Sequence, residues 1–204
     1  MRIGFLVLIG LCISFAQAQS AFTLKYFGLT SHPKGDPTAE LQPNKLDKNA
    51  RLVVNVGAIG GYEKFVFKDL YSVKVMQGFL ADCSNGFMSV SHIGARVMLY
   101  KDDKHRINFG IGPTFVFRES WNRFGSKYTS SGFFNEYTTK KGKEWQWKFV
   151  WYAFELEYDY CFNQKDNFSI SLIPVFPLAL ISNFGWKHWI EYKEYDKTRI
   201  YVPK

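Results

Sequence analysis

The sequence predicts an all-β fold: an eight-stranded antiparallel up-and-down transmembrane barrel that follows a cleaved signal peptide. Three observations lead to this prediction. Apolar and polar residues alternate with a period of two along almost the whole chain, and no convincing 3.6-residue pattern occurs. Aromatic residues make up 19% of the chain, which requires a large core or a lipid-facing belt. After the N-terminal segment, no run approaches the roughly 18 consecutive apolar residues of a membrane-spanning helix.

The N-terminal segment has the layout of a secretory signal peptide. One basic residue precedes an apolar run from Ile3 to Phe15, and small residues follow up to Ala18. Cleavage after Ala18 would leave an exported chain whose length suits one domain and which ends in a charged segment. The predicted divisions are a signal peptide over 1–18, an outer-membrane barrel over 19–192 and a charged C-terminal tail over 193–204.

Eight strands account for the alternation. They are predicted over residues 21–31, 50–62, 65–81, 87–100, 105–120, 146–162, 167–176 and 178–190. In the second strand, Val54 and Val56 lie opposite Asn55, and in the third, Val73 lies opposite Lys74. Each strand therefore has an apolar face and a face of glycines and polar side chains.

The fifth and sixth strands carry the clearest pattern. The fifth puts Phe109 and Phe115 on a face opposite Gly110 and Gly112, and the sixth alternates aromatic residues with Glu155, Glu157 and Asp159. Pro113 lies at the centre of the fifth strand and has no N–H to donate, so a bulge or a broken pairing is predicted there. Pro174 and Pro177 make the last two strands the hardest to place.

The lengths of the connections agree with a barrel whose N-terminus lies in the periplasm. Counted from the first strand, two odd-numbered connections are long and polar, at residues 32–49 and 121–145. The even-numbered connections are tight, at Glu63–Lys64, Lys101–Lys104 and Asn163–Asp166. Short periplasmic turns and longer outer loops produce this difference.

Two architectures share eight alternating strands and a signal peptide. A secreted barrel of the lipocalin type turns its apolar face inward around a small ligand, whereas an outer-membrane barrel turns it outward to lipid. The polar face here holds Asn55, Gly57, Ser72, Gly110 and Thr114, with few charges in mid-strand. Such small side chains suit a narrow lumen and would make a poor soluble exterior, which favours the membrane barrel.

The pattern resembles the small eight-stranded outer-membrane barrels of Gram-negative bacteria. The stretches "ARLVVNVGAIGGY" at 50–62 and "INFGIGPTFVF" at 107–117 carry the resemblance, which covers nearly all of the chain after Ala18, and no signature identifies a subfamily. It implies an outer-membrane location reached through the signal peptide. Such barrels usually finish on a strand with a terminal aromatic residue, but this chain continues past Trp189 into its charged tail.

Polar residues on the inward face are the first candidates for chemistry. Arg96 and Lys74 are positioned to pair with Glu155 and Glu157, because buried charges need partners or shifted pKa values. Such a cluster could be a proton relay, but the favoured interpretation is an ion-pair network that fills the barrel. The predicted lumen residues are Lys74, His92, Arg96, Arg118, Glu155, Glu157 and Asp159.

The outer rim offers a second candidate site. His32, Asp82 and Ser84 supply a base, an orienting carboxylate and a hydroxyl for acyl transfer. They resemble the rim constellation of lipid A palmitoyltransferases, in which Asp and Ser are adjacent, although Cys83 separates them here. Lipid A deacylases are a weaker match. Turn chemistry alone also explains Asp82 and Ser84.

The leading hypothesis is a non-enzymatic outer-membrane barrel with a role in the envelope or in surface interaction. A lipid A-modifying enzyme and a lipocalin-like ligand binder are the alternatives. The net charge of +8 suggests contact with outer-membrane lipid and lipopolysaccharide more than with nucleic acid. No cofactor or metal is expected, because no paired cysteine or histidine spacing occurs. The oligomeric state does not follow from the sequence.

Overall fold

The computed structural model describes residues 19–67, 70–128, 132–175 and 179–191. The structure contains strands joined by turns, loops and two short 3-10 helices, η1 (Ala39–Leu41) and η2 (Trp121–Lys127). The strands are β1 (Ser20–Ser31), β2 (Leu52–Val54), β3 (Val56–Phe67), β4 (Tyr71–Ala81), β5 (Phe87–Lys101), β6 (His105–Glu119), β7 (Asn135–Thr138), β8 (Glu144–Cys161), β9 (Asp166–Val175) and β10 (Ala179–Glu191). The predicted signal peptide, residues 1–18, and the whole predicted tail, residues 193–204, lie outside the described residues.

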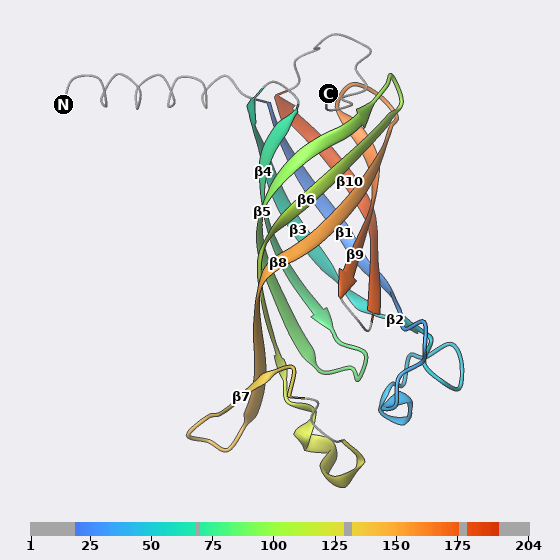
Figure 1. The fold of residues 1–204 in the computed structure, drawn as a ribbon, viewed down its shortest axis with the longest axis vertical. Helices are drawn as coiled ribbons and strands as arrows, with labels where there is room; N and C mark the ends of the chain where they lie inside the picture. Colours follow the sequence, from blue (N-terminus) through green and yellow to red (C-terminus); the bar gives the residue numbers. More distant parts are fainter. Residues whose placement is uncertain (1–18, 68–69, 129–131, 176–178, 192–204) are drawn as a thin grey trace, which may run out of the picture.

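The strands close into a barrel (Figure 1). Each barrel strand pairs antiparallel with the next in the order β10–β9–β8–β6–β5–β4–β3–β1, and β1 pairs back onto β10. The short strands β2 and β7 add to the edges of β1 and β8 at one end, leaving eight strands in the wall. The predicted eight-stranded antiparallel up-and-down barrel is confirmed.

The two ends of the barrel differ. One end, here called the loop end, carries residues 32–51, 82–86, 120–128 and 132–143. The other, the turn end, carries the tight connections at 102–104 and 162–165, together with the paired start of β1 and end of β10. This is the distribution of long and short connections that the sequence predicts. Figure 1 shows the loop end at the bottom.

The predicted turn at Glu63–Lys64 is wrong. β3 continues to Phe67, and the chain reverses before Tyr71. Glu63 is 1% exposed and faces the lumen, where cations from other strands pair with it. A charged dipeptide is an unreliable turn signal in a barrel whose interior is itself charged. The predicted second strand is also divided, because β2 ends at Val54 before β3 begins at Val56.

Pro113 lies at a bulge, as predicted. The register between β6 and β8 shifts between Gly112 and Thr114, where two steps along β6 correspond to three along β8. The residue before Pro113 must be a glycine for a separate, steric reason. A Cβ atom at this position would overlap the backbone carbonyl oxygen of Ile93 on β5, so the two strands approach too closely for any side chain.

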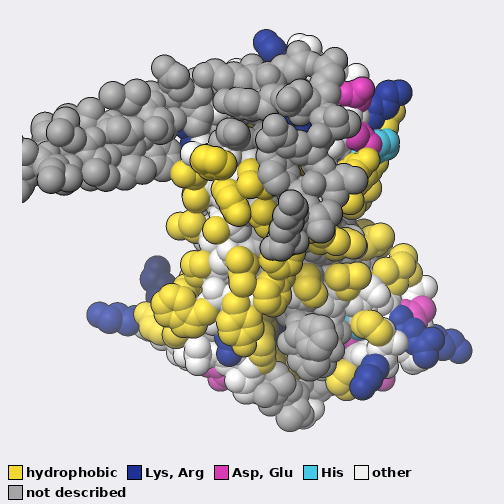
Figure 2. Space-filling view, turned by 45° about the horizontal axis from the view of Figure 1, so that its top comes forward, with side chains coloured by type: hydrophobic (Ala, Val, Ile, Leu, Met, Phe, Trp, Pro, Cys, Tyr) yellow, Lys and Arg dark blue, Asp and Glu magenta, His cyan; other side chains and the backbone are white. Residues whose placement is uncertain are grey.

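The exterior of the barrel is apolar. Large hydrophobic side chains from all eight wall strands point outward, among them Leu24, Phe79, Ile93, Ile111 and Trp151. Figure 2 shows them as a band across the visible face of the wall, with charged side chains gathered towards the ends. The lipocalin-like alternative is therefore wrong, because it requires the apolar face inside.

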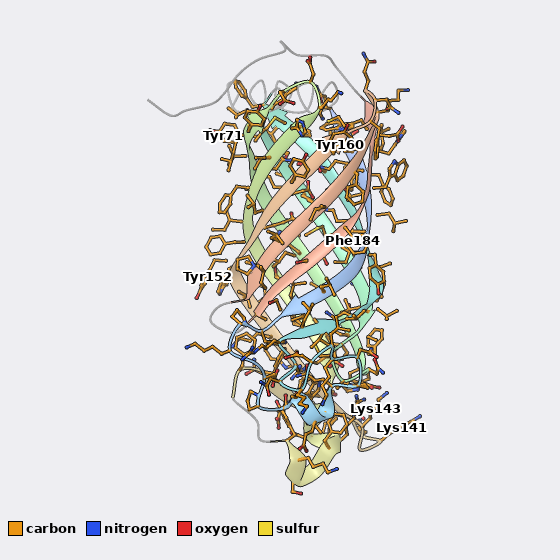
Figure 3. The ribbon with its side chains drawn as sticks, turned by 90° about the vertical axis from the view of Figure 1, so that its right-hand side faces the viewer. Tyr71, Lys141, Lys143, Tyr152, Tyr160 and Phe184 are labelled. Carbon is orange, nitrogen blue, oxygen red and sulfur yellow. The ribbon has the colours of Figure 1, made fainter. Side chains whose placement is uncertain are left out.

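Aromatic side chains concentrate near both edges of this band. At the loop end, Phe117 stacks on Trp145 with ring centroids 4.7 Å apart, and Phe87 contacts the same indole. Near the turn end lie Tyr71 and Tyr160 (Figure 3). Aromatic residues occupy these positions in membrane barrels because their rings suit the interface between hydrocarbon and water. Within the described residues, no helix is long and apolar enough to cross a membrane.

Candidate functional site

The lumen is occupied by a network of buried charges centred on Glu157 of β8. Its side chain is completely buried. Oε1 accepts hydrogen bonds from Arg96 at 2.7 Å and Lys187 at 2.6 Å. Oε2 accepts from Lys74 at 2.7 Å and also from Lys25. This one carboxylate thus binds cations from β5, β10, β4 and β1. The contacts of Glu157 therefore extend across the width of the lumen.

Three further carboxylates complete the network. Glu63 accepts from Arg96 at 2.8 Å and lies 3.2 Å from the ammonium of Lys187. Glu155 accepts from Lys74 at 3.1 Å, and Asp159 accepts from Lys187 at 2.8 Å. The four carboxylates therefore balance the four cations of Lys25, Lys74, Arg96 and Lys187. Such balance is what makes burial of so many charges tolerable in a low-dielectric interior.

The structure brings together five of the seven predicted lumen residues, namely Lys74, Arg96, Glu155, Glu157 and Asp159. The other two lie elsewhere. The imidazole of His92 faces the lumen but bonds to the Thr114 hydroxyl at 2.7 Å, outside the network. Arg118 lies at the loop end, where its guanidinium stacks 3.9 Å from the ring centroid of Phe134.

Sequence reasoning missed Lys25, Glu63 and Lys187. The signal for the two lysines was present in the parity of their strands. Lys25 lies between the outward residues Leu24 and Tyr26, and Lys187 follows the outward Trp186, so both lysines have inward parity. Glu63 was not predicted as a lumen residue because it was assigned to a turn. With all eight charges paired and nearly inaccessible, the network fills the lumen rather than lining a channel. Within the described chain, no group of His, Cys, Asp and Glu side chains is arranged to hold a metal ion.

The loop end contains a second cluster, built on Asp82 and Ser84. Asp82 Oδ1 accepts from the backbone N–H of Ser84 at 2.9 Å and from its hydroxyl at 2.7 Å. Asp82 Oδ2 accepts from the indole N–H of Trp121 at 2.6 Å, and Arg123 donates to the Ser84 hydroxyl at 2.9 Å. These bonds fasten η2 to the turn between β4 and β5.

His32, the predicted base, does not join this cluster. Its Nδ1 lies 3.9 Å from Asp36, and its Nε2 is buried with no hydrogen-bond partner among the described residues. The Ser84 hydroxyl donates to Asp82 instead of to an imidazole. The arrangement therefore lacks the contact between nucleophile and base that acyl transfer requires. Asp82 and Ser84 act here as turn residues.

Cys83 lies between Asp82 and Ser84, in surroundings that lower the reactivity of its thiol. Burial, followed by the nearby Asp82 carboxylate, raises the pKa of the Cys83 thiol to about 12. The thiolate is the reactive form, and it becomes scarce when the pKa rises. The thiol donates to Asn55 Oδ1 at 3.4 Å.

Alkylation of Cys83 is therefore expected to be slow at pH 8 in the folded protein. In a Cys161→Ser background of the chain that follows Ala18, the alkylation rate should be on the order of a hundredfold or more below that of the same protein unfolded in urea. Because the folded pKa is raised, the rate should keep rising with pH beyond the ordinary range for a cysteine. A rate that levels off near pH 9 in the folded protein would contradict the assigned environment of Cys83.

A closed wall of eight antiparallel strands, apolar outside and charged and filled inside, defines a small transmembrane β-barrel of the outer-membrane type. The sequence matches no protein-family model and no curated protein. Two solved structures from Pseudomonas aeruginosa are similar to this chain. The N-terminal β-barrel domain of OprF is 12% identical with a TM-score of 0.49, and the match covers 85% of this chain and all of that domain. The outer membrane protein OprG is 11% identical with a TM-score of 0.43, and the match covers 86% of this chain and 98% of OprG.

Proposed function

We propose that this protein is a non-enzymatic outer-membrane barrel, exported through the signal peptide, which supports the envelope and presents its basic loop end to the outer surface and to lipopolysaccharide. The loop end then faces outward and the turn end faces the periplasm, as the connection lengths favour. The observation that carries the proposal is the Glu157 network, because a lumen crossed by paired buried charges offers solutes no path.

The proposal predicts a folded membrane barrel that does not conduct. Protein reconstituted in phospholipid vesicles should show the heat-dependent gel mobility of a folded barrel. Vesicles that contain it should take up a small saccharide no faster than empty vesicles. A porin reconstituted in parallel would confirm that the assay detects conduction. Saccharide uptake by the folded barrel would contradict a filled lumen, and recovery as a soluble protein without a mobility shift would exclude the membrane barrel.

A further inference from the structure

A shallow apolar cleft, open over most of its surface, lies on the outside of the barrel wall at the loop end. Its volume is about 360 Å³, and its lining consists of Phe115 and Phe117 of β6, Tyr137 of β7 and Trp147 of β8. The rings of Phe115 and Trp147 stack with centroids 6.0 Å apart. The cleft continues the apolar exterior beside the aromatic edge formed by Phe117 and Trp145.

The cleft exists because β7 lies outside the barrel wall. β7 pairs with the first residues of β8, so that Asn135 lies opposite Trp147 and Tyr137 lies opposite Trp145. The hairpin that these two strands form projects sideways from the wall (Figure 1). Tyr137 therefore faces the cleft from the hairpin, while the other three aromatic residues face it from the wall and the adjoining part of β8.

The tip of this hairpin is basic. Lys140, Lys141 and Lys143 lie within its turn, and all three are exposed; Figure 3 labels two of them at the loop end. Lys143 lies 4.6 Å above the ring of Trp145 and 2.8 Å from Glu119, so it stands directly at the edge of the apolar surface. Across residues 118–148, seven lysines and arginines stand against three glutamates.

We propose that the cleft and these hairpin lysines together hold one phosphorylated lipid of the outer leaflet. An acyl chain would lie against the aromatic rings, and the phosphate would lie at Lys140 and Lys141, which form no ion pair within the described part of the chain. This inference rests on the proposed function, because it requires the barrel to lie in a membrane. Two features identify a lipid as the occupant: the cleft is continuous with the lipid-facing wall, and its basic border complements an anionic headgroup.

Brominated lipids provide a test, because bromine atoms on an acyl chain quench a tryptophan that they contact. The full chain is reconstituted in phosphatidylcholine vesicles that contain a small fraction of brominated phosphatidylglycerol or of brominated phosphatidylcholine with the same chains. The signal of Trp147 is obtained by subtracting the Trp147→Phe variant. We expect the anionic lipid to be preferred at Trp147 by about tenfold, since each lysine near a membrane surface attracts anionic lipid appreciably.

Two matched pairs of variants show which residues produce the preference for the anionic lipid. Lys140→Gln/Lys141→Gln/Lys143→Gln should abolish it, whereas Lys34→Gln/Lys45→Gln/Lys48→Gln, which removes the same charge from the other long loop, should keep it. Phe115→Ala should weaken quenching by either lipid at Trp147. Phe184→Ala, at another outward aromatic side chain (Figure 3), should not.

The outcomes separate this inference from the proposed function. A protein without heat-dependent mobility has not formed a membrane barrel, and the proposed function then fails. A folded barrel without preference for the anionic lipid overturns the lipid site alone. Loss of the preference on addition of inorganic phosphate, at constant ionic strength, would also overturn it, because the lysines would then bind any phosphate anion.

Discussion

Glu157→Gln is expected to lower the free energy of unfolding by about 3–5 kcal/mol, because removal of one partner leaves buried charges uncompensated. The amide keeps the shape of the side chain but removes the negative charge that Lys25, Lys74, Arg96 and Lys187 share. Urea unfolding in phospholipid vesicles, followed by tryptophan fluorescence, measures the change.

Glu144→Gln is the matched control, since it makes the same substitution in the same strand at an exposed position. Its effect is expected to stay within about 0.5 kcal/mol. The double variant Lys25→Met/Glu157→Gln restores the charge balance, so it should lose less than the sum of its two single variants. Equal losses for Glu157→Gln and Glu144→Gln would mean that the lumen charges are hydrated and contribute little.

Gly112→Ala is expected to destabilise the barrel by about 1–3 kcal/mol, as overpacking of a close contact does. The added methyl group would overlap the Ile93 carbonyl oxygen and the Cα of Gly94, which are backbone atoms and cannot rotate away. β5 and β6 would have to separate beside the Pro113 bulge. Heat-dependent mobility over a temperature series, together with urea unfolding, measures the loss.

Gly60→Ala gives the opposite expectation. An added Cβ on Gly60 of β3 meets nothing within 4 Å. The substitution should be neutral or stabilising by up to about 1 kcal/mol, since alanine restricts the unfolded chain. Comparable destabilisation at both positions would show that glycine is needed for general strand flexibility and not for close approach at Gly112.

The sequence predicted the wall of the barrel well, because period-two alternation depends directly on which face each side chain occupies. It also located the bulge at Pro113, since the missing N–H makes a regular ladder impossible there. The strand boundary at Glu63 could not be found in the same way. A charged residue marks either a turn or a lumen position, and the partners that distinguish these lie on other strands.

The candidate sites were predicted less completely. The alternation of side chains placed Glu155 and Glu157 inside the lumen but did not give their positions along the barrel axis. The register between strands was needed to show that His92 and Arg118 lie outside the Glu157 network. At the rim, the composition of His32, Asp82 and Ser84 suggested a catalytic triad. Turn hydrogen bonds and Trp121 instead occupy the carboxylate of Asp82. The cleft at Trp147 was not foreseen, because its formation depends on β7 folding back beside β8.

The pairing of β1 with β10 has a consequence for how the molecule assembles. Ser20 pairs with Glu191, so the wall closes through contacts between opposite ends of the described chain. Lys25 of β1 and Lys187 of β10 reach Glu157 from this seam. Closure of the seam therefore brings the last two cations to Glu157, and contacts so distant in sequence form slowly. Until the seam closes, the carboxylates of β8 lack two of their counter-ions. Transfer of these unpaired charges out of water is costly, so the inner face of an unclosed sheet is expected to stay hydrated.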